Sequence, residues 1–162
     1  MKKENQRLMC DFLLNNGIQN MVGVPDSTLQ FLIERGLKEK KAIIATREEE
    51  AIGIGVGMVL ADSPSLIFMQ NAGFANCIST ITSLVKLYEI PLLFIIGWRG
   101  YSQNDAPEHK LVGKIQPDLI KLIDLESKIV TDKNWKRNSR WALKKIQSST
   151  PCALIVRRIE NG

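Results

Sequence analysis

The chain has 162 residues, of which 44% are hydrophobic and 24% charged, and its formal net charge is +5 at pH 7. This composition predicts one domain, residues 1–162, with a sizeable core. No apolar run approaches the roughly 20 residues of a membrane helix, no secretory signal opens the chain, and no nucleic-acid-binding motif accompanies the basic residues, so we expect a cytoplasmic protein with neither a membrane nor a nucleic-acid partner.

Short apolar runs alternate with amphipathic stretches along the whole chain. In chain order, the predicted elements are helix 3–15, strand 21–24, helix 27–38, strand 42–45, helix 48–61, strand 66–69, helix 75–88, strand 92–96, strand 128–130, helix 134–148 and strand 153–156. Continuous apolar runs of this length are typical of strands buried on both faces. The predicted fold is therefore α/β: a three-layer, open, mostly parallel six-stranded sheet with helices on both faces.

Basic residues concentrate near the end of the chain. A solvated helix face followed by an edge strand explains them, although a mild positive field that attracts a small anionic substrate remains an alternative. The three cysteines show no C-x-x-C spacing, so we expect buried thiols and no metal ligands in this chain.

Polar or glycine-bearing segments follow the first four predicted strands. They are residues 24–27 (VPDS), 46–50 (TREEE), 70–76 (QNAGFAN) and 97–109, which include the only histidine, His109. In open α/β sheets, ligands bind beyond the carboxyl ends of the strands. These four segments are therefore the candidates for a functional site.

Three glutamates open the helix predicted over 48–61. Acidic residues in a first helical turn favour the helix dipole, and this explains them without any function. It does not explain the glycines at 53, 55 and 57, because each glycine inside a helix costs about 0.5–1 kcal/mol relative to alanine. Their spacing indicates a close approach by a neighbouring backbone or by a partner chain.

Several of these segments together resemble a known family. Residues 46–57 (TREEEAIGIGVG) and 69–76 (MQNAGFAN) resemble the glutamate-bearing segment and a glycine turn of thiamine-diphosphate-dependent 2-oxo acid decarboxylases. Residues 23–27 (GVPDS), 97–100 (GWRG) and 105–109 (DAPEH) resemble sulfopyruvate and phosphonopyruvate decarboxylases in particular. The resemblance runs from about residue 8 to 157 and covers the pyrimidine-binding (Pyr) domain.

The resemblance implies a role for one glutamate. Placing Gly57 on the last glycine of the family pattern puts Glu48 on the carboxylate that hydrogen-bonds the aminopyrimidine of the cofactor. That chemistry needs a largely desolvated carboxyl group with a strong, short hydrogen bond. Glu49 and Glu50 are expected to be solvated or paired, and a purely structural acidic cap is the alternative for Glu48.

The resemblance also implies roles in proton transfer and in substrate binding. His109, expected in a polar loop after the fourth strand, is a candidate for proton transfer, since imidazole exchanges protons near neutral pH. Asp26 and Ser27 would face the substrate, although either could simply cap a helix. Arg99 would pair with an anionic group of the substrate or merely with Asp105.

Cofactor contacts are implied for the third segment. Gln70, Asn71 and Gly73 would line the pocket of the cofactor, while the alternative for the two amides is turn chemistry ahead of the glycine. The family holds the diphosphate and Mg²⁺ on a second domain with a Gly-Asp-Gly opening, which this sequence lacks. The resemblance therefore implies a partner β subunit that supplies both anchors, with homodimerisation of the Pyr domain.

The predicted activity is that of the α subunit of a decarboxylase that converts 3-sulfopyruvate to sulfoacetaldehyde and CO2. Phosphonopyruvate is the second choice, since both substrates are small anionic 2-oxo acids. A non-catalytic regulatory Pyr-like subunit and a monomeric, flavodoxin-like anion-binding module are the other hypotheses.

Overall fold

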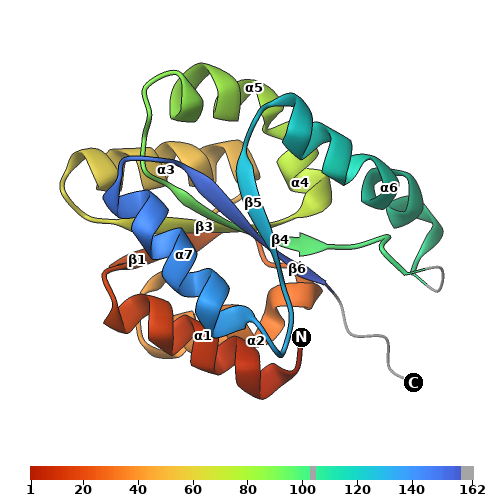
Figure 1. Cartoon of the computed structure of the whole chain (residues 1–162), viewed down its shortest axis with the longest axis horizontal. Helices are drawn as coiled ribbons and strands as arrows, with labels where there is room; N and C mark the ends of the chain where they lie inside the picture. Colours follow the sequence, from red (N-terminus) through yellow and green to blue (C-terminus); the bar gives the residue numbers. More distant parts are fainter. Residues whose placement is uncertain (103–104, 158–162) are drawn as a thin grey trace.

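The computed structural model describes residues 1–102 and 105–157 (Figure 1). Six strands form one sheet in the order β2-β1-β3-β4-β6-β5, and all five neighbouring pairs are parallel. The strands are β1 Asn20–Gly23, β2 Ala42–Ile44, β3 Ser65–Gln70, β4 Leu93–Trp98, β5 Glu126–Val130 and β6 Cys152–Arg157. The predicted six-stranded α/β sheet is confirmed, and it is wholly parallel among the described residues.

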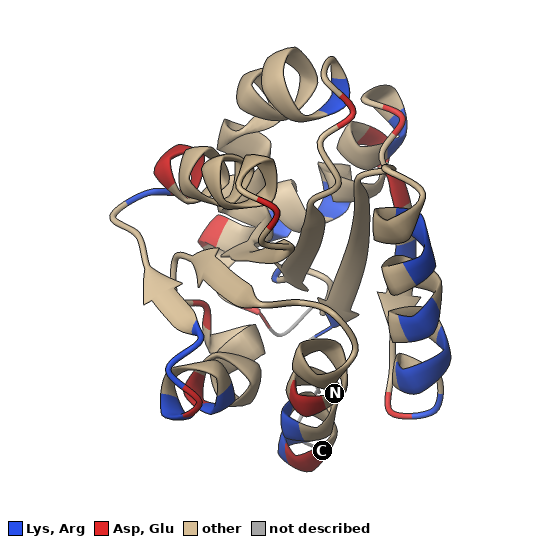
Figure 2. Cartoon of the chain, turned by 90° about the vertical axis from the view of Figure 1, so that its left-hand side faces the viewer, with Lys and Arg blue, Asp and Glu red and all other residues tan. Residues whose placement is uncertain are grey.

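Helices cover both faces of the sheet (Figure 1). One face carries α1 Lys3–Asn15, the 3-10 turn η1 Ser27–Leu29, α2 Gln30–Lys38 and α7 Trp135–Gln147. The other face carries α3 Glu48–Leu60, α4 Asn71–Asn76, α5 Ile78–Thr80, the π-helical turn η2 Ile81–Lys86 and α6 Pro107–Leu122. Lysines and arginines gather on α7, which is the solvated basic helix that the sequence predicts (Figure 2). The prediction of an edge after this helix is wrong, because β6 lies between β4 and β5.

Two apolar layers form the core, one on each side of the sheet. Successive side chains of a strand point to opposite faces, so Leu66 and Phe68 of β3 pack against α1 and α2 while Ile67 and Met69 face α3. All four side chains are at most 1% exposed. The central strands thus fulfil the expectation of burial on both faces.

The edge strands depart from that expectation. Ile43 and Ile44 of β2 are 41% and 46% exposed, and Ile129 of β5 is 38% exposed. An edge strand has a neighbour on one side only, and here the flanking helices do not extend over its outer residues. Apolar sequence alone did not distinguish these edges from the centre of the sheet.

Two helix predictions require correction. The helix predicted over 75–88 is divided into α4, α5 and the π-helical turn η2. The prediction missed α6 altogether, because Pro107 and Pro117 both suggest breaks. Pro107 occupies the start of the helix, where a proline fits since its missing N–H is not needed there, and Pro117 is tolerated inside the helix.

The topology locates a crevice for ligands. The chain proceeds from β1 outward to β2 and then crosses back to β3 on the other side of β1, so the strand order reverses between β1 and β3. Ligands of open parallel sheets bind beyond the carboxyl ends of the strands at such a switch point. None of the helices in the described ranges is long and apolar enough to cross a membrane.

Candidate active site

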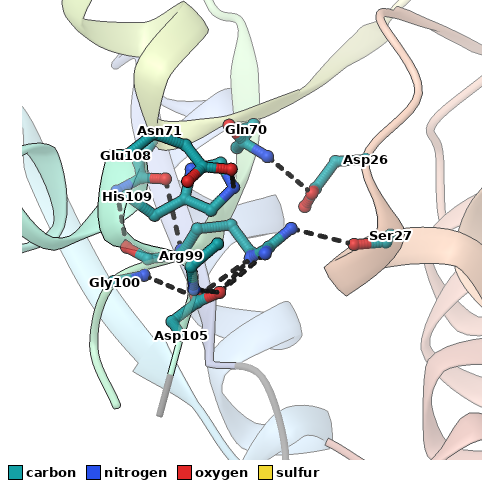
Figure 3. A network of polar contacts seen from close by, with 10 residues as sticks. Asp26, Ser27, Gln70, Asn71, Arg99, Gly100, Asp105, Glu108 and His109 are labelled. Atoms are coloured by element: carbon teal, nitrogen blue, oxygen red, sulfur yellow. Dashed lines mark hydrogen bonds and ion pairs between the residues drawn. The ribbon is translucent and has the colours of Figure 1, made fainter. Parts of the chain in front are cut away.

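Polar side chains from three strand ends converge at this carboxyl edge (Figure 3). Asp26, which follows β1, is 5% exposed. Gln70 ends β3, and its Nε2 donates to Asp26 Oδ1 at 3.3 Å, so the two residues span the switch point. Asp26 Oδ2 is buried and has no hydrogen-bond partner among the described residues. A buried carboxylate oxygen without a partner is unfavourable unless a ligand satisfies it.

Gly97 makes room for this carboxylate. It lies in β4 beside the switch point, and any Cβ atom added there would collide with Asp26 Oδ2. The sequence pattern offered a signal for this residue, since a glycine inside a strand indicates a close approach of another group. The prediction of the site nevertheless did not include Gly97.

Arg99 and Asp105 form a tight ion pair at the end of β4. Arg99 Nη2 lies 2.6 Å from Asp105 Oδ1, and Arg99 Nε donates to both carboxylate oxygens at 3.0 and 3.1 Å. The backbone N–H groups of Gly100 and Ala106 also donate to Asp105, at 2.7 and 2.9 Å. Hydrogen bonds from the guanidinium of Arg99 hold the pKa of Asp105 well below its ordinary value.

The remaining edge of the guanidinium points toward Ser27. Arg99 Nη1 donates to Ser27 Oγ at 3.2 Å, and this contact joins the end of β4 to the turn after β1 (Figure 3). The sequence left open whether Arg99 pairs with a ligand or with Asp105, and in this structure it pairs with Asp105. Asp26 is at the N-cap position of η1 but makes no side-chain capping bond.

Asn71 links the third strand to the fourth. It is fully buried; its Nδ2 donates to the carbonyl oxygen of Arg99 at 2.9 Å and its Oδ1 accepts from the Arg99 N–H at 3.2 Å. A carboxamide that both donates to and accepts from one residue fixes the position of that backbone. Asn71 therefore orients the segment that carries the ion pair.

Glu48 and Gly73 are in direct contact. The half-buried side chain of Glu48, in the first turn of α3, fills the space that a Cβ atom at Gly73 would need. Glu50 behaves differently: its carboxylate accepts from the Thr46 N–H at 2.8 Å and from Thr46 Oγ1 at 2.6 Å. The hydrogen bond from the Thr46 hydroxyl lowers the pKa of Glu50. The capping role thus falls to Glu50, and Glu48 is turned toward the start of α4.

His109 does not lie in a loop, which corrects the prediction. It is in the first turn of α6, where its side chain is 16% exposed and its Nε2 lies 3.9 Å from Glu108 Oε1. The carbonyl oxygen of His109 packs against Gly100, whose φ of +72° is a left-handed conformation that glycine adopts easily. The histidine is therefore held on a helix beside the Arg99 segment (Figure 3).

A carboxylate acceptor at this edge of the sheet suits the aminopyrimidine part of thiamine diphosphate. Glu48, whose side chain fills the space over Gly73, offers a carboxylate acceptor to a heterocyclic amine. The described residues contain no group of three or more histidine, cysteine, aspartate or glutamate side chains that could hold a metal ion.

Comparison with solved structures defines the class of the fold. The benzoylformate decarboxylase of Polynucleobacter necessarius superposes with a TM-score of 0.71, at 15% identity, over 94% of this chain and 29% of that chain. This likeness shows the fold alone, an open parallel α/β sheet with helices on both faces. No protein-family model matches the chain.

Curated relatives define the family. The chain is 32% identical over 115 residues to the sulfopyruvate decarboxylase subunit alpha of Methanococcus maripaludis, an alignment that covers 70% of this chain and 69% of the relative. It is 34% identical over 119 residues to the phosphonopyruvate decarboxylase of Streptomyces viridochromogenes, covering 72% of this chain but only 30% of that protein. The chain belongs to the family that comprises these decarboxylase subunits and enzymes, which confirms the resemblance.

Proposed function

We propose that this chain is the α subunit of a thiamine-diphosphate-dependent decarboxylase that converts 3-sulfopyruvate to sulfoacetaldehyde and CO2. The observation that carries the proposal is the half-buried Glu48 carboxyl group packed on Gly73 at the carboxyl edge of a Pyr-type sheet. Relatives that are named as subunit alpha of sulfopyruvate decarboxylase support this choice.

Thiamine diphosphate, when bound, supplies the electron sink for decarboxylation. In this proposal, Glu48 accepts a hydrogen bond from the aminopyrimidine ring, a contact that is strong because the carboxyl group is partly shielded from water. Gln70, Asn71 and Gly73 would form the wall of the site for that ring. The firm attachment of Asn71 to the Arg99 backbone keeps this wall in place.

The substrate would bind between the ends of β1 and β4. Ser27 Oγ and Arg99 Nη1, which lie 3.2 Å apart, would share the acidic head group of the substrate between them. Asp26, with one unsatisfied buried oxygen, would face the reacting end of the substrate. His109, whose backbone carbonyl packs against Gly100, is assigned the transfer of a proton.

A partner subunit would supply the diphosphate site and Mg²⁺. The outer face of α3 supports contact with another chain, because this helix carries no charged residue after Glu50 (Figure 2). A helix that is apolar all round is normally covered by other protein. Gly53 and Gly57 are exposed on this face and have no atoms within 4 Å of the position of an added Cβ, so another backbone can approach closely.

Reconstitution tests the proposal. The chain and a partner that carries the Gly-Asp-Gly domain are purified separately and mixed with thiamine diphosphate and Mg²⁺, and aldehyde release from 3-sulfopyruvate is measured. We expect activity from the mixture and from neither chain alone. Glu48→Gln should abolish turnover and leave assembly intact. Glu49→Gln, the matched control in the same helical turn, should retain turnover. Full activity of the Glu48→Gln mixture would refute the proposal.

Phosphonopyruvate is the second candidate substrate, favoured by the relatives that carry this name. The same mixture assayed with both acids distinguishes the two candidates by the ratio of their kcat/KM values. A regulatory subunit would instead change the activity of its partner without requiring Glu48.

A further inference from the structure

A pocket lies outside the candidate active site, between α6 and the edge strand β5. It has a volume of about 270 Å³, which suits a ligand smaller than a drug-sized molecule. Six of its lining residues carry the argument: Trp98, Gln116, Ile120, Lys121, Ser127 and Ile129. We refer to it as the α6–β5 pocket. It forms where the helix layer ends before the edge of the sheet and leaves apolar strand residues uncovered.

A proline shapes one wall of the pocket. Pro117 lies inside α6 and has no N–H to donate to the carbonyl oxygen of Gly113, four residues earlier. The indole Nε1 of Trp98 donates to that carbonyl oxygen instead, at 2.8 Å. The guanidinium of Arg157 lies 5.1 Å from the centroid of the Trp98 ring. The aromatic wall of the pocket is therefore fixed by specific contacts.

Gln116 is the polar residue in this wall that the fold leaves unexplained. It lies on the buried stripe of α6 with Gly113 and Ile120, and it is 1% exposed. Neither the Oε1 nor the Nε2 atom of its carboxamide has a hydrogen-bond partner among the described residues. Burying such a group without partners costs about 1–3 kcal/mol, and a leucine of similar shape would avoid this cost. Both amide atoms are closed to solvent in this structure, so a ligand in the adjoining pocket pairs with them when the Gln116 side chain turns toward it.

We propose that the α6–β5 pocket binds a compact ring molecule whose edge presents an N–H beside a C=O, as in a lactam. Such an edge donates to Gln116 Oε1 and accepts from Gln116 Nε2 at the same time, which satisfies both buried atoms. The rings pack against Trp98, Ile120 and Ile129, and Ser127 and Lys121 add hydrogen-bond donors to the lining. The proposal does not depend on the decarboxylase assignment.

Two matched probes test the pairing on the full chain. The bicyclic lactam carbostyril has the required edge, and N-methyl carbostyril has the same rings without the donor. We expect nuclear magnetic resonance titration to shift the side-chain amide signals of Gln116 and the indole N–H signal of Trp98. The N-methyl probe should bind about fivefold to tenfold more weakly, the effect of one net hydrogen bond. Equal affinity of the two probes, no binding up to the solubility limit, or shifts confined to other regions would overturn the proposal.

Variants give an independent check. Gln116→Leu removes the amide and should fold at least as well as the native chain, since it also removes the unsatisfied group. It should bind both probes with affinities that agree within about twofold. Gln147→Leu, a matched change at an exposed position of α7, should retain the discrimination. If Gln116→Leu fails to fold, the comparison of the two probes on the native chain decides alone. If addition of the partner subunit abolishes probe binding, the pocket belongs to a protein interface and the proposal of a small-molecule site fails.

Discussion

Gly73→Ala should test the catalytic role proposed for Glu48 separately from the stability of the fold. Gly73 lies in α4, and an added Cβ atom there would meet the Cγ, Cδ and Oε1 atoms of Glu48. These atoms belong to a flexible side chain and not to backbone, so the side chain can move aside. The substitution therefore displaces the carboxyl group without removing it.

Two opposing terms set the expected change in stability. Alanine gains about 0.5–1 kcal/mol over glycine inside a helix, while forcing Glu48 away from its preferred rotamer costs about 0.5–1.5 kcal/mol. The net change in the free energy of unfolding should lie within about 1 kcal/mol. For a chain of this length, 1 kcal/mol shifts Tm by about 2–4 °C, so we expect a Tm within about 4 °C of the native value.

The activity should respond much more strongly than the stability. Misplacing a catalytic group by about 1 Å can reduce the rate about 100-fold, so we expect a loss of that order in kcat of the reconstituted enzyme. Gly57→Ala is the control for stability: with no atom within 4 Å of the added Cβ, it should raise the Tm of the isolated chain by about 2–4 °C. Native activity of Gly73→Ala, or a loss of several kcal/mol in stability, would contradict the reasoning.

Three further predictions concern stability and reactivity. Asp105→Asn should lower the free energy of unfolding by about 1.5–3 kcal/mol at neutral pH, because the charged bonds to Arg99 are lost. Since Arg99 depresses the pKa of Asp105, the contribution of the pair to stability is complete above about pH 4 and is lost as the pH falls further. In urea denaturation, the difference in the free energy of unfolding between the native chain and the variant should therefore become smaller below that pH. In thermal unfolding, Gly100→Ala should destabilise the chain by about 1–3 kcal/mol, because the backbone at φ +72° and the carbonyl oxygen of His109 both oppose a side chain. Gly17→Ala, at φ +120° with nothing within 4 Å of the added Cβ, should lose less stability in the same assay. Burial raises the pKa of the thiols of Cys10, Cys77 and Cys152 to about 12. Alkylation at pH 8, detected by mass spectrometry, should therefore modify none of them in the native chain and all of them in denaturant. Rapid alkylation of the folded chain, or a pH-independent gap for Asp105→Asn, would contradict these expectations.

The local sequence predicted the secondary structure correctly where length, composition and flanking turn residues all favoured the same element. The runs at 66–69 and 92–96 are strands buried on both faces, as their short length, β-prone residues and flanking turn signals predicted. The TREEE segment could be assigned to a helix start at the edge of the sheet, and the glycines after it indicated a close approach. Gly55 does pack against Ile67, whereas Gly53 and Gly57 face open space.

Other features depend on contacts between segments far apart in the chain. The helix α6 could not be recognised because Pro107 and Pro117 suggest breaks, and its stability relies on Trp98 satisfying the Gly113 carbonyl from another element. His109 was consequently assigned to a loop. The sequence also left open which glutamate caps α3. The contact of Glu50 with Thr46 and that of Glu48 with Gly73 distinguish the two side chains.

The sequence by itself determined the alternation of strands and helices, the order of the polar segments and the family, because periodicity and short motifs are properties of neighbouring residues. Only the tertiary structure decided that Arg99 pairs with Asp105, that Asp26 keeps one buried oxygen unsatisfied, and that Gln116 has no partner. Hydrogen bonding and burial are properties of three-dimensional neighbours: the crossover from β2 to β3 brings Gln70 beside Asp26, and the segment after β4 folds Asp105 back onto Arg99.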